Sequence, residues 1–134
     1  MINEEKRLYV VVAATIQVLG PRTVVQPPGR QVAQACHAVS KLRMKMMVEA
    51  KRTPSTGDFS LTGPITTIVL QARDANELYH VNQLLFKKKI LFAVFLDTNP
   101  EYGPGAWMTA TCTEPVTKRR VEGILDYLPL WGAQ

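Results

Sequence analysis

The stretch RQVAQACHAVSKLRMKM, residues 30–46, contains two overlapping patterns. Its apolar residues recur at intervals of three and four, which is the period of a helix with one buried face. They are Val32, Ala35, Cys36, Val39, Leu42 and Met46. This spacing predicts an amphipathic helix that begins at Arg30 and extends to about Ala50.

Polar side chains form a second stripe on the same helix. Arg30, Gln34, His37, Lys41 and Lys45 are separated by four, three, four and four residues, so at about 100° per residue they cover an arc about 60° wide. On most amphipathic helices such a stripe is the solvated face. Here it contains no carboxylate, and it combines an amide and an imidazole with cations that suit phosphate groups. The pattern leaves both a solvated face and an anion-binding surface open.

Strand patterns lie on either side of this helix. Runs of apolar and β-branched residues predict strands at residues 8–12, 66–70, 90–96 and 107–112. Proline and glycine predict a loop at residues 20–29, with room for a short hairpin. The Ser-, Thr-, Gly- and Pro-rich residues 51–64 are predicted to form an exposed connection.

Two further helices are predicted. Asp74, with Glu77 three residues later, forms a capping box before a helix that ends at the cations Lys87, Lys88 and Lys89. Thr117 is placed to cap a last short helix, whose apolar face is Val121, Ile124, Leu125 and Leu128. The order strand, helix, strand, helix, strand, strand, helix predicts an α/β fold with helices on both faces of one sheet.

Length and composition indicate one domain, residues 1–134. The 134 residues are 46% hydrophobic and 20% charged, enough for a core without metal or disulfide staples. Cys36 and Cys112 are too few for a disulfide scaffold, and we expect both to be reduced, buried thiols.

The charge balance suggests an acidic partner. The formal net charge of +5 makes nucleic acid the first candidate. The apolar run at residues 8–16 is too short to span a bilayer, and no signal peptide is visible. We therefore expect a soluble, cytoplasmic protein.

Asp97 is the first candidate for chemistry. It ends a buried strand and precedes a Gly- and Pro-rich loop, and open α/β sheets bind ligands at the carboxyl ends of strands. An aspartate that caps Asn99 or a neighbouring amide is the simpler interpretation. Thr109 and Thr111 could line the same edge, although threonine is common in strands for its shape.

Several motifs of other enzyme classes are missing. The sequence has no phosphate loop ending in Lys-Ser/Thr, no nucleophile elbow and no His/Cys cluster with metal-ligand spacing. This disfavours a nucleotide hydrolase and a metalloenzyme, and it predicts neither metal nor cofactor. Any catalysis would use water, a carboxylate base and cationic or amide stabilisation.

The helix motif resembles a known family. Residues 29–38, GRQVAQACHA, are similar without gaps to the start of the first helix in type II peptidyl-tRNA hydrolases. The later segments follow the family's order, including Asp97, the Pro104-Gly105 loop, Pro115 and the closing Leu128-Pro129-Leu130. The resemblance covers most of the chain except residues 21–28 and 51–64.

This resemblance implies a fold, an activity and a set of site residues. The family's fold is a three-layer α/β/α domain with a mixed four-stranded sheet, usually in a homodimer. Its activity is hydrolysis of the ester between a peptide and the 3′ ribose of tRNA. Arg30 stands at the family's catalytic-site lysine, and Gln34, His37, Asp97 and Thr109 match its other site residues.

The same resemblance assigns roles. Asp97 would orient or deprotonate the attacking water, while Arg30 and Gln34 would stabilise developing negative charge or hold the terminal phosphate. His37 would position the substrate. The cations expected to contact the phosphates of the tRNA acceptor stem are Lys41, Lys45, Lys87, Lys88 and Lys89.

Three departures from the family pattern keep other functions open. Arginine replaces lysine at Arg30, Ala13-Ala14-Thr15 replaces an arginine-x-aspartate, and a threonine-glutamine is replaced near Glu101-Tyr102. A guanidinium keeps the charge but cannot deprotonate. One alternative is a catalytically inactive RNA- or protein-binding module on the same fold. A weaker one is a hydrolase of another acyl or amide bond.

Overall fold

The computed structural model describes residues 5–17, 23–52 and 65–132. Two α-helices, six strands and two short 3-10 helices occur in these ranges. Their order is β1 (Lys6–Gln17), β2 (Thr23–Val25), α1 (Pro28–Arg52), β3 (Thr67–Asp74), α2 (Ala75–Lys87), β4 (Phe92–Asp97), η2 (Pro100–Tyr102), β5 (Trp107–Thr113), β6 (Val116–Thr117) and η3 (Arg119–Val121).

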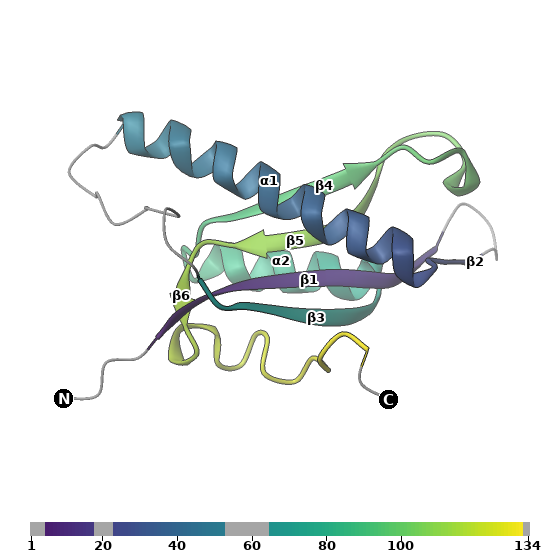
Figure 1. Cartoon of the computed structure of the whole chain (residues 1–134). Helices are drawn as coiled ribbons and strands as arrows, with labels where there is room; N and C mark the ends of the chain where they lie inside the picture. The colour runs from purple at the N-terminus through teal and green to yellow at the C-terminus, as the bar shows by residue number, and fades with distance from the viewer. Residues whose placement is uncertain (1–4, 18–22, 53–64, 133–134) are drawn as a thin grey trace.

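Strand β1 organises the sheet (Figure 1). It pairs in parallel with β3 and antiparallel with β5, and β5 pairs antiparallel with β4, so the sheet is mixed. The predicted α/β class is therefore confirmed. The predicted count of four strands is wrong, because β2 and β6 also pair with the two ends of β1 and make a six-stranded sheet.

The helices pack on opposite faces of β1. Leu8, Val10 and Val12 of β1 lie in one apolar cluster with Ala38, Leu42 and Met46 of α1. The alternate residues Tyr9, Val11 and Ala13 lie in a second cluster with Leu78, Val81 and Leu85 of α2. Figure 1 shows α1 crossing the front of the sheet and α2 behind it. A strand that is apolar on both faces requires such covering on both sides.

The capped helix forms as predicted. The Asp74 carboxylate accepts a hydrogen bond from the backbone N–H of Glu77 at 2.8 Å, and the Glu77 carboxylate accepts one from the N–H of Arg73 at 2.8 Å. These bonds satisfy N–H groups that have no partner inside the helix. Helix α1 is longer than predicted, from Pro28 to Arg52.

The predicted last helix is wrong. Only a 3-10 turn, η3, forms, and turns follow it. Thr117 does accept a hydrogen bond from the N–H of Arg120, at 3.4 Å. Gly123 then adopts a φ of 80°, in the left-handed region, which an α-helix cannot contain. The four predicted apolar residues are nevertheless buried, namely Val121, Ile124, Leu125 and Leu128.

Two of the predicted connecting segments lie partly outside the described residues. The short hairpin forms, because β2 pairs antiparallel with β1, while residues 18–22 lie outside the described residues. Most of the predicted connection, residues 53–64, also lies outside them. After η3, residues 129–131 lie along β3: the N–H of Gln71 donates to the carbonyl of Pro129 at 2.9 Å, and that of Trp131 to Val69 at 2.8 Å.

The two thiols differ in environment. Cys112 is buried in β5, whereas Cys36 is exposed on α1, so the prediction that both are buried is wrong for Cys36. Cys36 follows the apolar period of the helix, but it lies at the margin of the face that α1 packs on the sheet. Burial raises the pKa of the Cys112 thiol to about 12.

We therefore predict that the two cysteines react at very different rates with a thiol reagent. At pH 8, Cys36 should be alkylated in the folded protein, whereas Cys112 should react only in denaturant, because the thiolate is the reactive form. Mass spectrometry of the alkylated peptides measures both. Equal labelling of the two in the folded protein would contradict this assignment.

Candidate functional site

The polar stripe of α1 faces the end of β4. The side-chain N–H of Gln34 donates to Oδ2 of Asp97 at 2.7 Å, although the two residues are far apart in the sequence. Gln34 is only 3% exposed. Asp97 is not the cap of the following turn: Asn99 accepts the N–H of Glu101 at 3.0 Å. The structure thus brings together two of the predicted site residues.

Two residues that the sequence analysis did not select extend this pair. Gln26, buried just before α1, donates from its side chain to the carbonyl of Ala13 at 2.6 Å. The hydroxyl of Tyr102 donates to Oε1 of Gln26 at 2.9 Å, and Tyr102 is 1% exposed. Its sequence signal is a large aromatic residue inside a Gly- and Pro-rich loop, which typically anchors the loop to the core.

Charges near Tyr102 affect its titration. Burial, followed by the negative charge of Asp97, raises the pKa of Tyr102 above 10, although Arg30 acts in the opposite direction. The phenol therefore stays a neutral hydrogen-bond donor at physiological pH, and it keeps the amide of Gln26 oriented.

Arg30 is held by an ion pair. Its guanidinium lies 2.9 Å from Oε2 of Glu101, at the start of the loop that follows Asp97. The hydrogen bond and the charge of Arg30 lower the pKa of Glu101, and Glu101 raises that of Arg30. Both residues are departures from the family pattern, and here they contact each other. Arg30 lies one helical turn before Gln34 on α1, and both Arg30 and Asp97 act on the pKa of Tyr102.

One buried acceptor in the site lacks a partner. Oε1 of Gln34 is buried and has no hydrogen-bond partner among the described residues. A buried polar atom without a partner costs free energy, and such atoms often mark the place of a ligand or water. The side chain of Gln34 therefore orients Asp97 with its N–H, while its carbonyl oxygen stays without a partner among the described residues.

The rest of the stripe continues along β4. The imidazole of His37 stacks on the ring of Phe95, with centroids 4.6 Å apart, and the ammonium of Lys41 lies 5.9 Å from the same centroid. Lys45 donates to the carbonyl of Phe92 at 2.8 Å. His37, Lys41 and Lys45 are exposed. The stripe is therefore neither a plain solvated face nor part of the core, because its side chains rest on aromatic rings of the sheet.

The two threonines of β5 lie within the protein. Thr109 is fully buried, and its hydroxyl lies 3.5 Å from the carbonyl of Phe95 at a β-bulge. Thr111 donates to the side chain of Asn82 in α2 at 2.7 Å. In the described part of the chain, no hydrogen bond joins either threonine to Asp97.

The three lysines at the end of α2 that are predicted to bind tRNA lie in two different environments. Lys87 and Lys89 line a groove of about 550 Å³ together with Lys45. Lys88 instead donates to the carbonyl of Glu122 at 3.3 Å, on the side of the C-terminal segment. Lys87, Lys88 and Lys89 are consecutive in the sequence, but their side chains do not form one cationic cluster.

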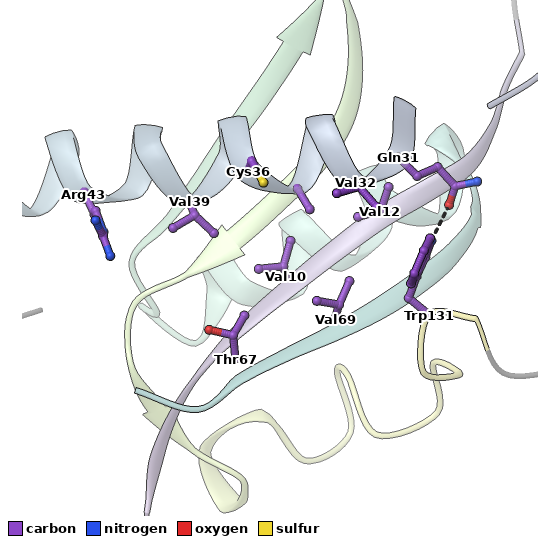
Figure 2. Close-up of a pocket in the computed structure, with 11 residues that line it drawn as sticks. Val10, Val12, Gln31, Val32, Cys36, Val39, Arg43, Thr67, Val69 and Trp131 are labelled. Atoms are coloured by element: carbon purple, nitrogen blue, oxygen red, sulfur yellow. Dashed lines mark hydrogen bonds between the residues drawn. The ribbon is translucent and has the colours of Figure 1, made fainter. Parts of the chain in front are cut away.

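A second, apolar groove lies on the other side of α1 (Figure 2). Its volume is about 410 Å³, and five of its eleven lining residues are valines of β1, β3 and α1. Gln31 closes one end, where its side chain accepts a hydrogen bond from the indole N–H of Trp131 at 2.9 Å. Arg43 lies at the other end (Figure 2). No catalytic candidate of the stripe lines this groove.

Residues 5–17, 23–52 and 65–132 contain neither a membrane-spanning helix nor a metal-binding cluster. No helix there is long and apolar enough to cross a bilayer. No group of three or more His, Cys, Asp and Glu side chains there is arranged to hold a metal ion.

In this structure one long helix, α1, packs on a mixed sheet. An amide of the helix and a carboxylate at the end of a strand form a hydrogen bond. The family model for peptidyl-tRNA hydrolase PTH2 matches residues 8–131, so the chain belongs to this family. No curated protein matches the sequence.

A solved structure supports the fold. The chain is similar to a protein of unknown function from Agrobacterium tumefaciens strain C58, with a TM-score of 0.51 and 12% sequence identity. The match covers 94% of this chain and 97% of that one.

We predict that Tyr102→Phe destabilises the protein by about 1–3 kcal/mol, because it removes the main donor to the buried Oε1 of Gln26. Urea denaturation followed by circular dichroism measures the change. Tyr79→Phe is the matched control, since Tyr79 is exposed on α2 and its hydroxyl should matter little. Equal midpoints for the two variants would show that the Tyr102 hydrogen bond does not stabilise the site.

Proposed function

We propose that this protein hydrolyses the ester between a peptide and the 3′ ribose of tRNA. The observation that carries the proposal is the 2.7 Å hydrogen bond between Gln34 and Asp97, made from the helix motif of the family. It pairs a carboxylate with an amide at the carboxyl end of a strand, which is where a hydrolytic water could be bound and activated.

The proposed reaction starts at Asp97. One of its oxygens is oriented by Gln34, which leaves the other to accept a proton from water as the water attacks the ester carbonyl. The tetrahedral intermediate then collapses, the bond from the carbonyl carbon to the ribose oxygen breaks, and the ribose oxygen takes a proton. The products are a free peptide carboxylate and tRNA with an intact 3′ hydroxyl.

Arg30 is proposed to stabilise negative charge. A guanidinium at this edge can hold either the developing oxyanion or the terminal phosphate of the tRNA. Its ion pair with Glu101 would then have to exchange for the substrate anion. Because both side chains are partly exposed, this exchange is not costly.

The remaining residues are proposed to position the tRNA. His37 would position the substrate from the stripe, and Thr109 would support the end of β4 through the carbonyl of Phe95. Lys41, Lys45, Lys87 and Lys89 would contact phosphates. Lys88 is not included, because its side chain lies against the C-terminal segment and does not line the groove of Lys45, Lys87 and Lys89. An A-form stem is recognised by shape and charge. A homodimer, a cytoplasmic location and activity without a cofactor belong to the same proposal.

The alternative is an inactive RNA- or protein-binding module on the same fold, in which Arg30 would stay paired with Glu101. Purified protein and a peptidyl-tRNA distinguish the two functions. Release of free tRNA supports hydrolysis. Binding of tRNA without turnover would support the binding module instead.

We predict that Asp97→Asn lowers the rate of peptidyl-tRNA hydrolysis by about a hundredfold or more, which is the usual scale for a lost general base. The melting temperature should change by only a few degrees, because asparagine keeps the shape and can still pair with Gln34. Single-turnover hydrolysis measures the rate.

The matched control for this variant is Asp126→Asn, which changes an exposed carboxylate in the C-terminal segment. It should hydrolyse substrate at the wild-type rate. If Asp97→Asn did so too, Asp97 would have no part in the mechanism.

We also predict opposite effects at the two ends of the Arg30–Glu101 ion pair. Arg30→Ala should abolish most activity, while Arg30→Lys should retain or raise it, because a cation is needed there. Glu101→Gln frees the guanidinium and should tighten tRNA binding by up to about fivefold at low salt. Filter binding and turnover measure these effects. Normal turnover by Arg30→Ala would mean that the cation at this position has no part in catalysis.

A further inference from the structure

A groove of about 550 Å³ lies where the C-terminal half of α1 meets the turn between α2 and β4. We refer to it as the Phe86 groove, and the residues that line it are Lys45, Phe86, Lys87, Lys89, Ile90, Leu91 and Phe92. Its volume is in the range of small-ligand pockets. Its floor is apolar, and its charged side chains are all cations.

Phe86 is the most unusual member of the groove. It is 77% exposed, although it belongs to a well-ordered helix with a buried apolar face on the other side. A large aromatic side chain left in water at the margin of a groove offers a flat surface on which a planar ligand can stack.

Three cations line the groove together with Phe86. The ammonium of Lys45 is held by the carbonyl of Phe92 at 2.8 Å and lies 5.7 Å from the Phe92 ring centroid. Because an ammonium has three donors, this one can still bind an anion. Lys87 and Lys89 lie across the groove from α1, and none of the seven lining residues is acidic. A ligand with a planar ring and negative charge complements this surface.

Lys89 adopts a backbone conformation that usually favours glycine. Its φ is 58°, and it is the one non-glycine residue with positive φ among the described residues. Its N–H donates to the carbonyl of Phe86 at 3.0 Å, which ends α2. Glycine is the common residue at such helix ends. The lysine therefore stands where backbone energetics alone would prefer a residue without a side chain.

The groove is connected to the proposed active site by the polar stripe. Lys45 lies about three helical turns, or about 16 Å, from Gln34 along α1, and His37 and Lys41 rest on Phe95 between them. At about 3.4 Å per nucleotide along one strand, this separation spans about five nucleotides. An RNA with its 3′ end at Asp97 would reach the groove with the nucleotides just upstream.

We propose that the Phe86 groove binds an unpaired nucleotide of single-stranded RNA, with its base stacked on Phe86 and its phosphates neutralised by Lys45, Lys87 and Lys89. The inference rests on the proposed function only for the direction of the strand, with the 3′ end at Asp97. Aromatic stacking between cations is the usual chemistry of sequence-tolerant single-strand binding. The groove thus selects an RNA with an unpaired end over a blunt duplex, whose bases are already stacked.

Binding of 5′-labelled, non-acylated oligoribonucleotides, measured by fluorescence anisotropy, tests the groove without requiring hydrolysis. Phe86→Leu keeps an apolar side chain and removes the ring, and it should weaken binding of a seven-nucleotide strand by about tenfold. Tyr127→Leu is the matched control, because Tyr127 is an exposed aromatic residue near Glu77 and Asp126.

The lysines provide a second test within one short segment. Lys87→Gln should lower the slope of log affinity against log salt by about 0.7, the value for one single-strand phosphate contact, whereas Lys88→Gln should leave it unchanged. Lys89→Gly should lower the slope in the same way while the melting temperature stays equal or rises, because glycine suits the positive φ. A weaker slope with intact folding identifies a lost phosphate contact.

Several outcomes would overturn the proposal. They are equal binding by Phe86→Leu and wild type, equal effects of Lys87→Gln and Lys88→Gln, preference for a blunt duplex, or displacement of the RNA by polyglutamate at comparable concentration, which would indicate an acidic protein partner. Turnover assays on the same variants separate the two proposals. Hydrolysis with no role for Phe86 in binding refutes the groove, whereas Phe86-dependent binding without hydrolysis refutes the proposed activity.

Discussion

The double burial of β1 is the constraint on which the rest of the structure depends. Its side chains alternate between two apolar clusters, so α1 and α2 must cover opposite faces of the sheet. The end of β1 also fixes the start of α1. The carbonyls of Ala13 and Ala14 accept hydrogen bonds from the side chain and the backbone N–H of Gln26. This anchor sets the entry of α1 and so aligns Gln34 with Asp97.

The departures from the family pattern gather at this same corner. Arg30 contacts Glu101, Tyr102 bonds Gln26, and Gln26 in turn bonds the carbonyl of Ala13. Residues that differ from the family in three separate segments are thus linked through direct contacts. The linkage places these residues in one set of contacts beside the Gln34–Asp97 pair. It also explains why arginine is accommodated: its planar fork has a carboxylate partner within reach.

The spacing of residues predicted those elements whose formation depends on local sequence. The stripe of α1, the capping box at Asp74 and the strand that ends at Asp97 all followed from spacing. It could not separate Lys88 from its two neighbours, because their directions depend on how the chain leaves α2 at Lys89. The last helix failed for a related reason: Val121, Ile124, Leu125 and Leu128 have helical spacing, but one glycine turns the backbone. Gln26 gave no signal, and the aromatic residue in the Gly- and Pro-rich loop, Tyr102, did not reveal its partner, since the hydrogen-bond partners of both come from distant segments.

The contact of residues 129–131 with β3 has a consequence for the protein's behaviour in concentrated solution. Strand β3 has β1 on one side, and a strand with a bare second side is a template for recruiting strands from other molecules. The backbone bonds of Gln71 and Trp131 occupy part of that side. Pro129 has no N–H to offer to a further strand. Residues 129–131 therefore hinder the pairing of a further strand with β3, and so oppose cross-β assembly at this edge of the sheet.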